Sequence, residues 1–308
     1  MVPPELEGPL DRAVRTCFQV SWGRARGWVE GGKIRVGGAV VRDPLHRVVR
    51  GSEIELDEAA RRVVEVDLDD AAVVFADSQV VVVAKPAGIS TVPFDENETG
   101  TLDARVRSWL GRRGLAARGS RPNLGVVHRI DKETTGLVVF TRTWAAKQSL
   151  TSQFRAHTVY RRYLALAYGD VRSAVFRSLL VADRGDGLRG STRPGKGSSG
   201  RAPQGADAPR EAVTHVERLE GLRGATLVGC RLETGRTHQI RIHLSEAGHP
   251  LVGERVYVRR YRGPLLEAPR LMLHAAELGF EHPTDGRPMR WEQPMPDDMR
   301  AVLETLRG

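Results

Sequence analysis

The chain has 308 residues, of which 40% are hydrophobic and 28% charged, so it is expected to fold around a core, and wholesale disorder is not expected. No stretch approaches the roughly 18 consecutive apolar residues of a membrane span. The N-terminal sequence has neither the basic start nor the apolar run of a secretory signal. Cys17 and Cys230 stand far apart, which excludes a disulfide framework and a cysteine-based zinc site. We therefore expect a cytoplasmic protein and, since no heptad repeat indicates a partner subunit, a monomer.

Positive charge gives the first indication of function. Lys and Arg number 47 against 38 Asp and Glu, a net charge of +9. The excess is concentrated in residues 101–163, which contain 13 Lys or Arg and 3 Asp or Glu. This concentration favours a polyanionic partner such as nucleic acid, although a solvated basic face would produce part of the same pattern.

Residues 1–60 are predicted to form a small α/β unit. Apolar residues at helical spacing predict a helix over 10–20, and a second helix begins after Ser21, a typical N-cap, and ends at Gly31. KIRVGGAVVRDP then predicts strand, Gly-Gly turn and strand, and RVVRGSEIEL a further strand. Four cations of this unit are candidate RNA contacts: Arg24, Arg26, Lys33 and Arg35.

The acidic residues 61–71 are predicted to form a linker, and residues 72–308 a larger domain of mixed helices and strands. Helical periodicity covers 102–114 and 144–157, and β-rich runs occupy most of the rest. Residues 183–210 are rich in Gly, Pro, Ser and Arg, which predicts a flexible loop or insertion.

Three local patterns do not carry the functions that they suggest. GSTRPGK has phosphate-loop spacing, but Gly197 stands where Ser or Thr would reach magnesium, and no strand precedes it. HRIDKETTG differs from a kinase catalytic loop because Ile130 separates Arg from Asp and no Asn follows. No metal site is expected from three histidines whose spacing fits no helix face and among which arginines stand: His238, His243 and His249.

Other segments are harder to explain as structure alone. Asp131 follows the basic pair His128-Arg129 and precedes Lys132, just before an apolar strand. Nearby positive charge should keep this carboxylate ionised; the structural alternative is an aspartate that caps its own turn. RRYLALAYG predicts a strand in which small Ala neighbours leave space beside the ring of Tyr163.

The segment QIRIHL alternates apolar and polar residues, which predicts a strand over 239–244. Its apolar residues would face the core: Ile240, Ile242 and Leu244. Its polar residues would form a row facing a cleft: Gln239, Arg241 and His243.

Together these segments resemble the RNA pseudouridine synthase family, in the branch that modifies ribosomal and transfer RNA, over most of residues 72–300. HRIDKETTGL resembles the family signature HR[LI]DxxTSGL, and RRYLALAYG resembles KxYxAxxxG with Arg161 for Lys. TGRTHQIRIHLSEAGHPLVGE, LHAAELGFEHP and AKPAG resemble three further motifs; Ala84 replaces an Asn, and Glu254 an Asp. SWGRARGWVEGGKIRVGGAVV resembles the small RNA-binding module named after ribosomal protein S-four; the alternative is a basic helical hairpin that caps the next domain.

The resemblance implies an α+β fold, with a mixed, largely antiparallel sheet around a central cleft. The implied activity is isomerisation of uridine to pseudouridine in structured rRNA or tRNA, on a base flipped out of its helix. RNA is the implied partner, and no metal or nucleotide cofactor is expected because the isomerisation involves no net redox change or hydrolysis.

The resemblance also assigns site residues. Asp131 is similar to the essential aspartate, Tyr163 to the active-site tyrosine, and Arg241 to the basic residue expected to form a bidentate pair with Asp131. Leu273 would floor the base pocket. Further substrate-binding positions are expected at His128, Arg129, Thr135, Arg236, His238 and Gln239.

Several alternatives stay open. Asp131 could attack C1′ of the ribose, attack C6 of the base, or take a proton from C2′. The protein could instead be a non-catalytic RNA-binding or ribosome-assembly protein on the same fold. A glycosidase with paired carboxylates is disfavoured because Asp131 lacks a second carboxylate on the same face.

Overall fold

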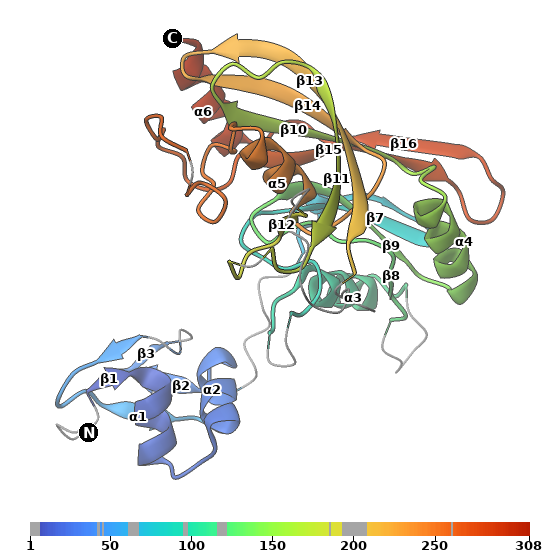
Figure 1. Cartoon of the computed structure of the whole chain (residues 1–308). Helices are drawn as coiled ribbons and strands as arrows, with labels where there is room; N and C mark the ends of the chain where they lie inside the picture. Colours follow the sequence, from blue (N-terminus) through green and yellow to red (C-terminus); the bar gives the residue numbers. More distant parts are fainter. Residues whose placement is uncertain are drawn as a thin grey trace. The chain divides into compact units, whose positions relative to one another are not determined.

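The computed structural model of the chain describes residues 7–41, 44, 46–60, 68–94, 98–115, 122–184, 186–192, 208–259 and 261–308. The chain divides by internal contacts into two units (Figure 1). The first unit comprises Met1–Asp67 with Val92–Trp109, and the second comprises Leu68–Thr91 with Leu110–Gly308. Residues 92–109, which the sequence analysis assigned to the larger domain, thus group with the first unit.

The described part of the first unit contains most of helix α3 (Leu102–Arg112) and, before residue 60, two short helices and five short strands. In chain order these are β1 (Gly8–Pro9), α1 (Leu10–Cys17), α2 (Trp22–Glu30), β2 (Ile34–Val36), β3 (Ala39–Val40), β4 (Arg47–Val48) and β5 (Ile54–Leu56). The strands pair as β3-β2-β5 and β1-β4. Ser21 caps α2 by accepting a hydrogen bond from the backbone N–H of Arg24. A core between the helices and β2 contains Leu10, Ala13, Val14, Ala25, Val29, Ile34 and Val48.

One large sheet organises the second unit. Its strands are β6 (Val73–Ala76), β7 (Val80–Lys85), β8 (Gly125–Val126), β9 (Thr135–Thr141), β10 (Tyr160–Tyr168), β11 (Ala174–Val181), β12 (Gly190–Ser191), β13 (Arg210–Leu222), β14 (Ala225–Leu232), β15 (Leu273–Glu281) and β16 (Pro288–Glu292). Their order is β12-β11-β13-β14-β10-β15-β9-β7-β6, with β16 beside β15 and β8 beside β9. Every pair is antiparallel except β15 with β9, which is parallel.

Helices cover this sheet in two places. α4 (Trp144–Arg155) packs Leu150 against the apolar side chains of β7, β9 and β15. α6 (Asp297–Arg307) packs Met299, Leu303 and Leu306 against β10 and β14. The remaining helices are η2 (Asp70–Ala72), α3 (Leu102–Arg112) and α5 (Gln239–Glu246). No helix among the described residues is long and apolar enough to cross a membrane.

The predicted fold class is confirmed: the sheet is mixed and mostly antiparallel, and both periodic helices lie where expected. Most of the predicted linker, residues 61–67, lies outside the described residues. In the predicted loop at 183–210, Gly190–Ser191 forms edge strand β12 against the end of β11. Residues 185 and 193–207 lie outside the described residues.

Candidate active site

Asp131 lies in the loop that joins β8 to β9, and polar contacts fix this loop on both sides. Thr91 Oγ1 donates to the carbonyl of Ile130 (2.9 Å) and accepts from its N–H (3.2 Å). The buried Nζ of Lys85 donates to the carbonyl of Lys132 and to two other carbonyls, each at 2.8 Å. An ammonium group has three N–H donors, so all are used. The carboxylate is thereby held on a fixed backbone.

Strand β10 supplies two further side chains. Residues of a strand alternate between its faces, so Arg161 and Tyr163 point to one side and Arg162 to the other. Arg162 forms ion pairs with Glu217 (3.2 Å) and Glu277 (3.1 Å). Arg161 and Tyr163 are both buried and line the pocket beside Asp131. Burial raises the pKa of Tyr163, so its phenol stays protonated at neutral pH.

The strand predicted over residues 239–244 is wrong: these residues form helix α5, and all six are buried. Alternation of apolar and polar residues marks a strand only when one face is solvated. Here the polar side chains are buried as well, because hydrogen bonds satisfy them. Gln239 bonds to Thr234 (2.7 Å) and Thr214 (2.9 Å), and His243 bonds to Ser178 (2.8 Å).

Arg241, in the first turn of α5, links two carboxylates. Its Nε and Nη2 donate to the two oxygens of Glu254, at 2.7 and 2.8 Å. Its Nη1 donates to Oδ2 of Asp131 at 3.3 Å. The expected bidentate pair therefore joins Arg241 to Glu254 and not to Asp131, because Glu254 occupies the two adjacent donors. The guanidinium also lies over the ring of Tyr257, 5.2 Å from its centre.

His238 precedes α5 in a left-handed backbone conformation, with φ of 59°. This conformation is uncommon for a residue other than glycine. The imidazole Nδ1 lies 2.7 Å from the hydroxyl of Tyr257, and Nε2 lies 3.8 Å from Oδ2 of Asp131. Burial is the main cause that lowers the pKa of His238, although the charge of Asp131 opposes it. His238 is thus a mainly neutral neighbour of the carboxylate at pH 7.

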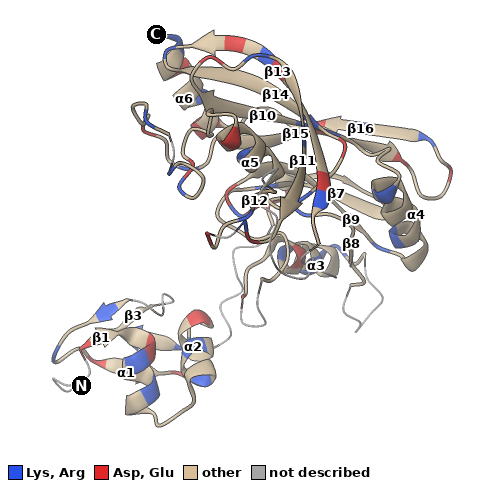
Figure 2. Ribbon diagram, in the orientation of Figure 1, with Lys and Arg blue, Asp and Glu red and all other residues tan. Residues whose placement is uncertain are grey.

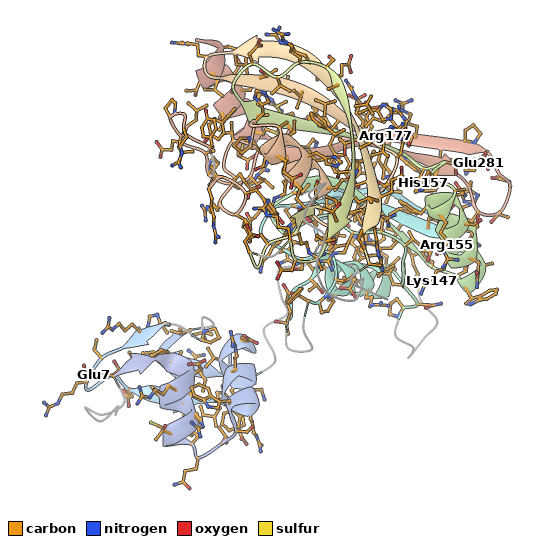
Figure 3. The ribbon with its side chains drawn as sticks, in the orientation of Figure 1. Glu7, Lys147, Arg155, His157, Arg177 and Glu281 are labelled. Carbon is orange, nitrogen blue, oxygen red and sulfur yellow. The ribbon has the colours of Figure 1, made fainter. Side chains whose placement is uncertain are left out.

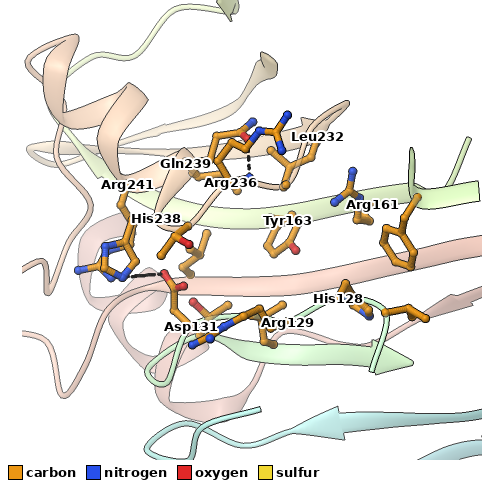
Figure 4. A pocket seen from close by; sticks show the side chains of 18 residues that line it. His128, Arg129, Asp131, Arg161, Tyr163, Leu232, Arg236, His238, Gln239 and Arg241 are labelled. Atoms are coloured by element: carbon orange, nitrogen blue, oxygen red, sulfur yellow. Dashed lines mark hydrogen bonds and ion pairs between the residues drawn. The ribbon is translucent and has the colours of Figure 1, made fainter. Parts of the chain in front are cut away.

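These groups surround one pocket of about 280 Å³. Figure 4 shows Asp131, His238 and Arg241 at one end, Arg161 and His128 at the other, and the ring of Tyr163 between them. The floor and walls add apolar side chains: Val127, Ile130, Phe154, Leu232, Ile240 and Leu273. A flat ring could therefore lie in the pocket with its attached sugar near the carboxylate.

His128 does not act as the cation that its sequence suggests. Its ring stacks on Phe154, with centroids 4.8 Å apart, and Nε2 accepts a hydrogen bond from the N–H of Val139. Burial, and then the charge of Arg161, lower the pKa of His128 to about 3. Its ring is neutral and forms part of the pocket wall.

Most of the expected substrate-binding residues line the pocket, namely His128, Arg129, Arg236, His238, Gln239 and Leu273. Thr135 is not among the lining residues; its hydroxyl lies 2.9 Å from Nδ1 of the buried His274. His249 bonds to the carbonyl of Tyr168 (2.8 Å). Its partner differs from those of His238 and His243, and no cluster of three potential metal ligands occurs among the described residues.

The four candidate RNA contacts of the first unit lie on its surface or close to it. The guanidinium of Arg24 lies over the ring of Trp28 (5.1 Å), and Arg26 pairs with Glu30 (3.1 Å). Lys33 donates to the carbonyl of Glu58 (2.7 Å). Arg35 donates to the carbonyl of Gly38 (3.0 Å).

Sequence reasoning missed the roles of two residues of the site, one beside Arg241 and one in the pocket wall. Glu254 counted only as a departure from the family motif, yet it anchors Arg241. Arg161 counted only as the replacement of a motif Lys, yet it is buried and donates to the carbonyl of Glu233 (2.8 Å). Its Nε has no hydrogen-bond partner among the described residues. The alternation of β10 could have placed Arg161 beside Tyr163.

The fold and this pocket define an RNA-modifying isomerase. The family model described as RNA pseudouridylate synthase matches residues 79–246, more than half of the chain. The chain belongs to the RNA pseudouridine synthase family, and it is an isomerase of that family.

Relatives resemble the chain along nearly its whole length. Ribosomal large subunit pseudouridine synthase D of Pseudomonas aeruginosa is 36% identical over 99% of this chain and 94% of its own. The protein of the same name from Nitrosomonas europaea is 34% identical over 100% and 87%. Among solved structures, human RNA pseudouridylate synthase domain containing 4 matches 77% of this chain and 93% of its own with a TM-score of 0.61. Its 21% identity supports the fold alone.

Proposed function

We propose that this chain converts specific uridines of large-subunit ribosomal RNA to pseudouridine, with Asp131 as the group that acts on the flipped-out nucleotide. The observation that carries the proposal is the contact of Asp131 with Arg241 inside a pocket that also holds Tyr163. The relatives named ribosomal large subunit pseudouridine synthase D support the choice of RNA.

The reaction breaks the bond between N1 of the base and C1′ of the ribose and joins C5 of the same base to C1′. The proton leaves C5 and N1 gains one, so atoms and electrons balance without a redox partner or a cofactor. Asp131 supplies the negative charge near the sugar, and Arg241 keeps that charge in place. The ring of Tyr163 stacks on the uracil while it turns.

A uridine inside a helix cannot reach this pocket, so it must be flipped out. Positive charge would hold the flanking RNA. Helix α4 carries two exposed cations, Lys147 and Arg155, and no acidic residue. Figure 3 labels both residues at α4, and Figure 2 shows blue segments on this helix. We propose that a monomer is active, and that it acts in the cytoplasm.

The first unit is proposed to bind RNA as an S-four-like module. Its support is the order of two helices followed by short strands, and the exposed cations of α2. Arg24, Arg26 and Arg35 are exposed. The unit would increase the affinity for RNA without contributing residues to catalysis.

The test is Asp131→Asn, which keeps the shape of the side chain and removes its charge. Pseudouridine is measured in an unmodified transcript of large-subunit ribosomal RNA. We expect loss of activity with an unchanged unfolding midpoint. A folded variant with wild-type turnover would contradict the role of Asp131. If the wild-type protein binds the transcript but forms no pseudouridine in it, the non-catalytic alternative is favoured.

A further inference from the structure

A second hollow adjoins the uridine pocket and is not used by the proposed chemistry. It has a volume of about 350 Å³ and shares the wall Gly235–Thr237 with the uridine pocket. Ile242 of α5 and the end of β11 form part of the remaining wall. The other lining residues are Ala182, Arg189, Ala208 and Arg210. The two hollows are therefore neighbours that meet at the 235–237 turn.

Three arginines line this second hollow: Arg189, Arg210 and Arg236. None of its lining residues carries a carboxylate. Arg236 is held by a hydrogen bond from Nε to the carbonyl of Glu211 (2.9 Å). The side chains of Arg189 and Arg210 are exposed and form no hydrogen bond or ion pair within the described parts of the chain. Three positive charges around one hollow create a site for an anion.

Two acidic residues of this region pair with a different arginine. Asp186 and Glu246 both pair with Arg184, at 3.0 and 3.5 Å. The charge of Arg189 also affects a residue of the uridine pocket, His238. Burial is the main cause of the lowered pKa of His238, and the charges of Arg241 and, less strongly, Arg189 act in the same direction. An anion held by Arg189 would thus lie close to the bound uridine.

The floor of the hollow also has apolar residues, which could contact a base while the arginines contact an anion. Leu180 and Ile242 are buried apolar residues that line it beside the arginines. Single-stranded RNA is bound by cations for its phosphates and by apolar or planar groups for its bases. A nucleotide offers both, whereas an inorganic anion would use the arginines alone.

We propose that this hollow binds a nucleotide adjacent to the target uridine on the same strand, with its phosphodiester held by Arg189, Arg210 and Arg236. This inference rests on the proposed function, because it takes the occupant of the neighbouring pocket to be a uridine of RNA. The shared 235–237 turn would separate the two nucleotides. Binding energy at this site would position the flipped uridine without contact to the reacting atoms.

The test compares two double variants that lose the same charge. Arg189→Ala/Arg210→Ala empties the site and spares Arg236, which lines both hollows. Arg172→Ala/Arg223→Ala is the control; these exposed arginines lie at the other end of the β11–β13–β14 sheet edge, about 25 Å away by the length of β11. Affinity for the unmodified ribosomal transcript is measured by filter binding over a range of salt concentrations.

We expect the Kd of the Arg189/Arg210 variant to rise about tenfold or more, since each lost contact is a charge-assisted hydrogen bond. The slope of log Kd against log salt should fall by at most about 0.7, the value for one phosphate contact with a single strand, because Arg189 and Arg210 hold the same phosphodiester. Turnover at saturating RNA should stay within about twofold of wild type. Equal affinities of the two double variants would refute the nucleotide site, as would a loss of turnover at unchanged Kd.

A neutral methylphosphonate linkage identifies the phosphate. Placed beside the target uridine, it should weaken binding to wild-type protein and have little further effect on the Arg189/Arg210 variant. Equal losses in both proteins would overturn the assignment of this phosphate to the site. If wild-type protein forms no pseudouridine while the Arg189/Arg210 variant still binds more weakly than its control, the proposed function fails and the nucleotide site stands.

Discussion

The buried carboxylate of Glu254 offers the sharpest test of how the site is held together. Its side chain is 1% exposed, and it accepts hydrogen bonds from two donors of Arg241 at 2.7 and 2.8 Å. Oε1 also accepts from the backbone N–H of Val256 (2.8 Å). The change Glu254→Gln removes the charge and turns an amide NH₂ toward the guanidinium, which can only donate.

Removing one partner of a buried ion pair costs about 3–5 kcal/mol, because the other charge is left buried. Arg241 retains Asp131 as a second partner at 3.3 Å, so we expect the lower end, about 3 kcal/mol of unfolding free energy. Turnover should fall as well, since Arg241 loses the anchor that aims it at Asp131. Urea unfolding and pseudouridine formation measure the two effects.

Glu254→Asp is the matched control, because it keeps the carboxylate and is one methylene shorter. We expect it to lose less than half the stability lost by Glu254→Gln. The pH dependence adds a second readout. Burial raises the pKa of Glu254, but Arg241 and the backbone N–H groups of Val256 and Tyr257 outweigh it and hold the pKa below its ordinary value of 4.5.

A carboxyl group whose folded-state pKa is depressed stabilises the protein above its unfolded pKa, and this contribution is lost as pH falls through the folded value. The stability gap between wild type and Glu254→Gln should therefore be full near neutral pH and shrink below about pH 4.5. The reasoning is refuted if Glu254→Gln is as stable as Glu254→Asp, or if the gap does not change with pH.

Two further predictions concern RNA binding. Tyr163→Ala should raise the Kd for the ribosomal transcript about tenfold, since base stacking contributes about 1–3 kcal/mol. Tyr163→Phe keeps the ring and should bind RNA as the wild type does. Equal Kd values for the two variants would exclude stacking. The double variant Arg24→Ala/Arg26→Ala in the first unit should weaken RNA binding and lower its salt dependence, while turnover at saturating RNA stays unchanged. An unaltered slope of log Kd against log salt would show that these residues do not contact RNA phosphates.

The local elements of the second unit were largely predictable because their periodicity is strong. The helix at 144–157 has one buried face, so the spacing of its apolar residues indicated a helix. The apolar run Val80–Val83 is buried throughout in strand β7, as is typical of a central strand. The segment 239–244 was not predictable in this way. Its polar residues are buried and hydrogen-bonded to β13 and to the 233–236 turn, so alternation carried no information about solvent.

The sequence alone determined the family and the chemical groups of the candidate site, because Asp131, Tyr163 and Arg241 each sit within a long motif. Tertiary structure decided how these groups are held. Glu254 follows Arg241 by 13 positions, and only the turn after α5 brings its carboxylate against the guanidinium. The second hollow likewise gathers Arg189, Arg210 and Arg236 from separate segments. Such convergence depends on how strands and turns pack in space, and spacing along the chain does not encode it.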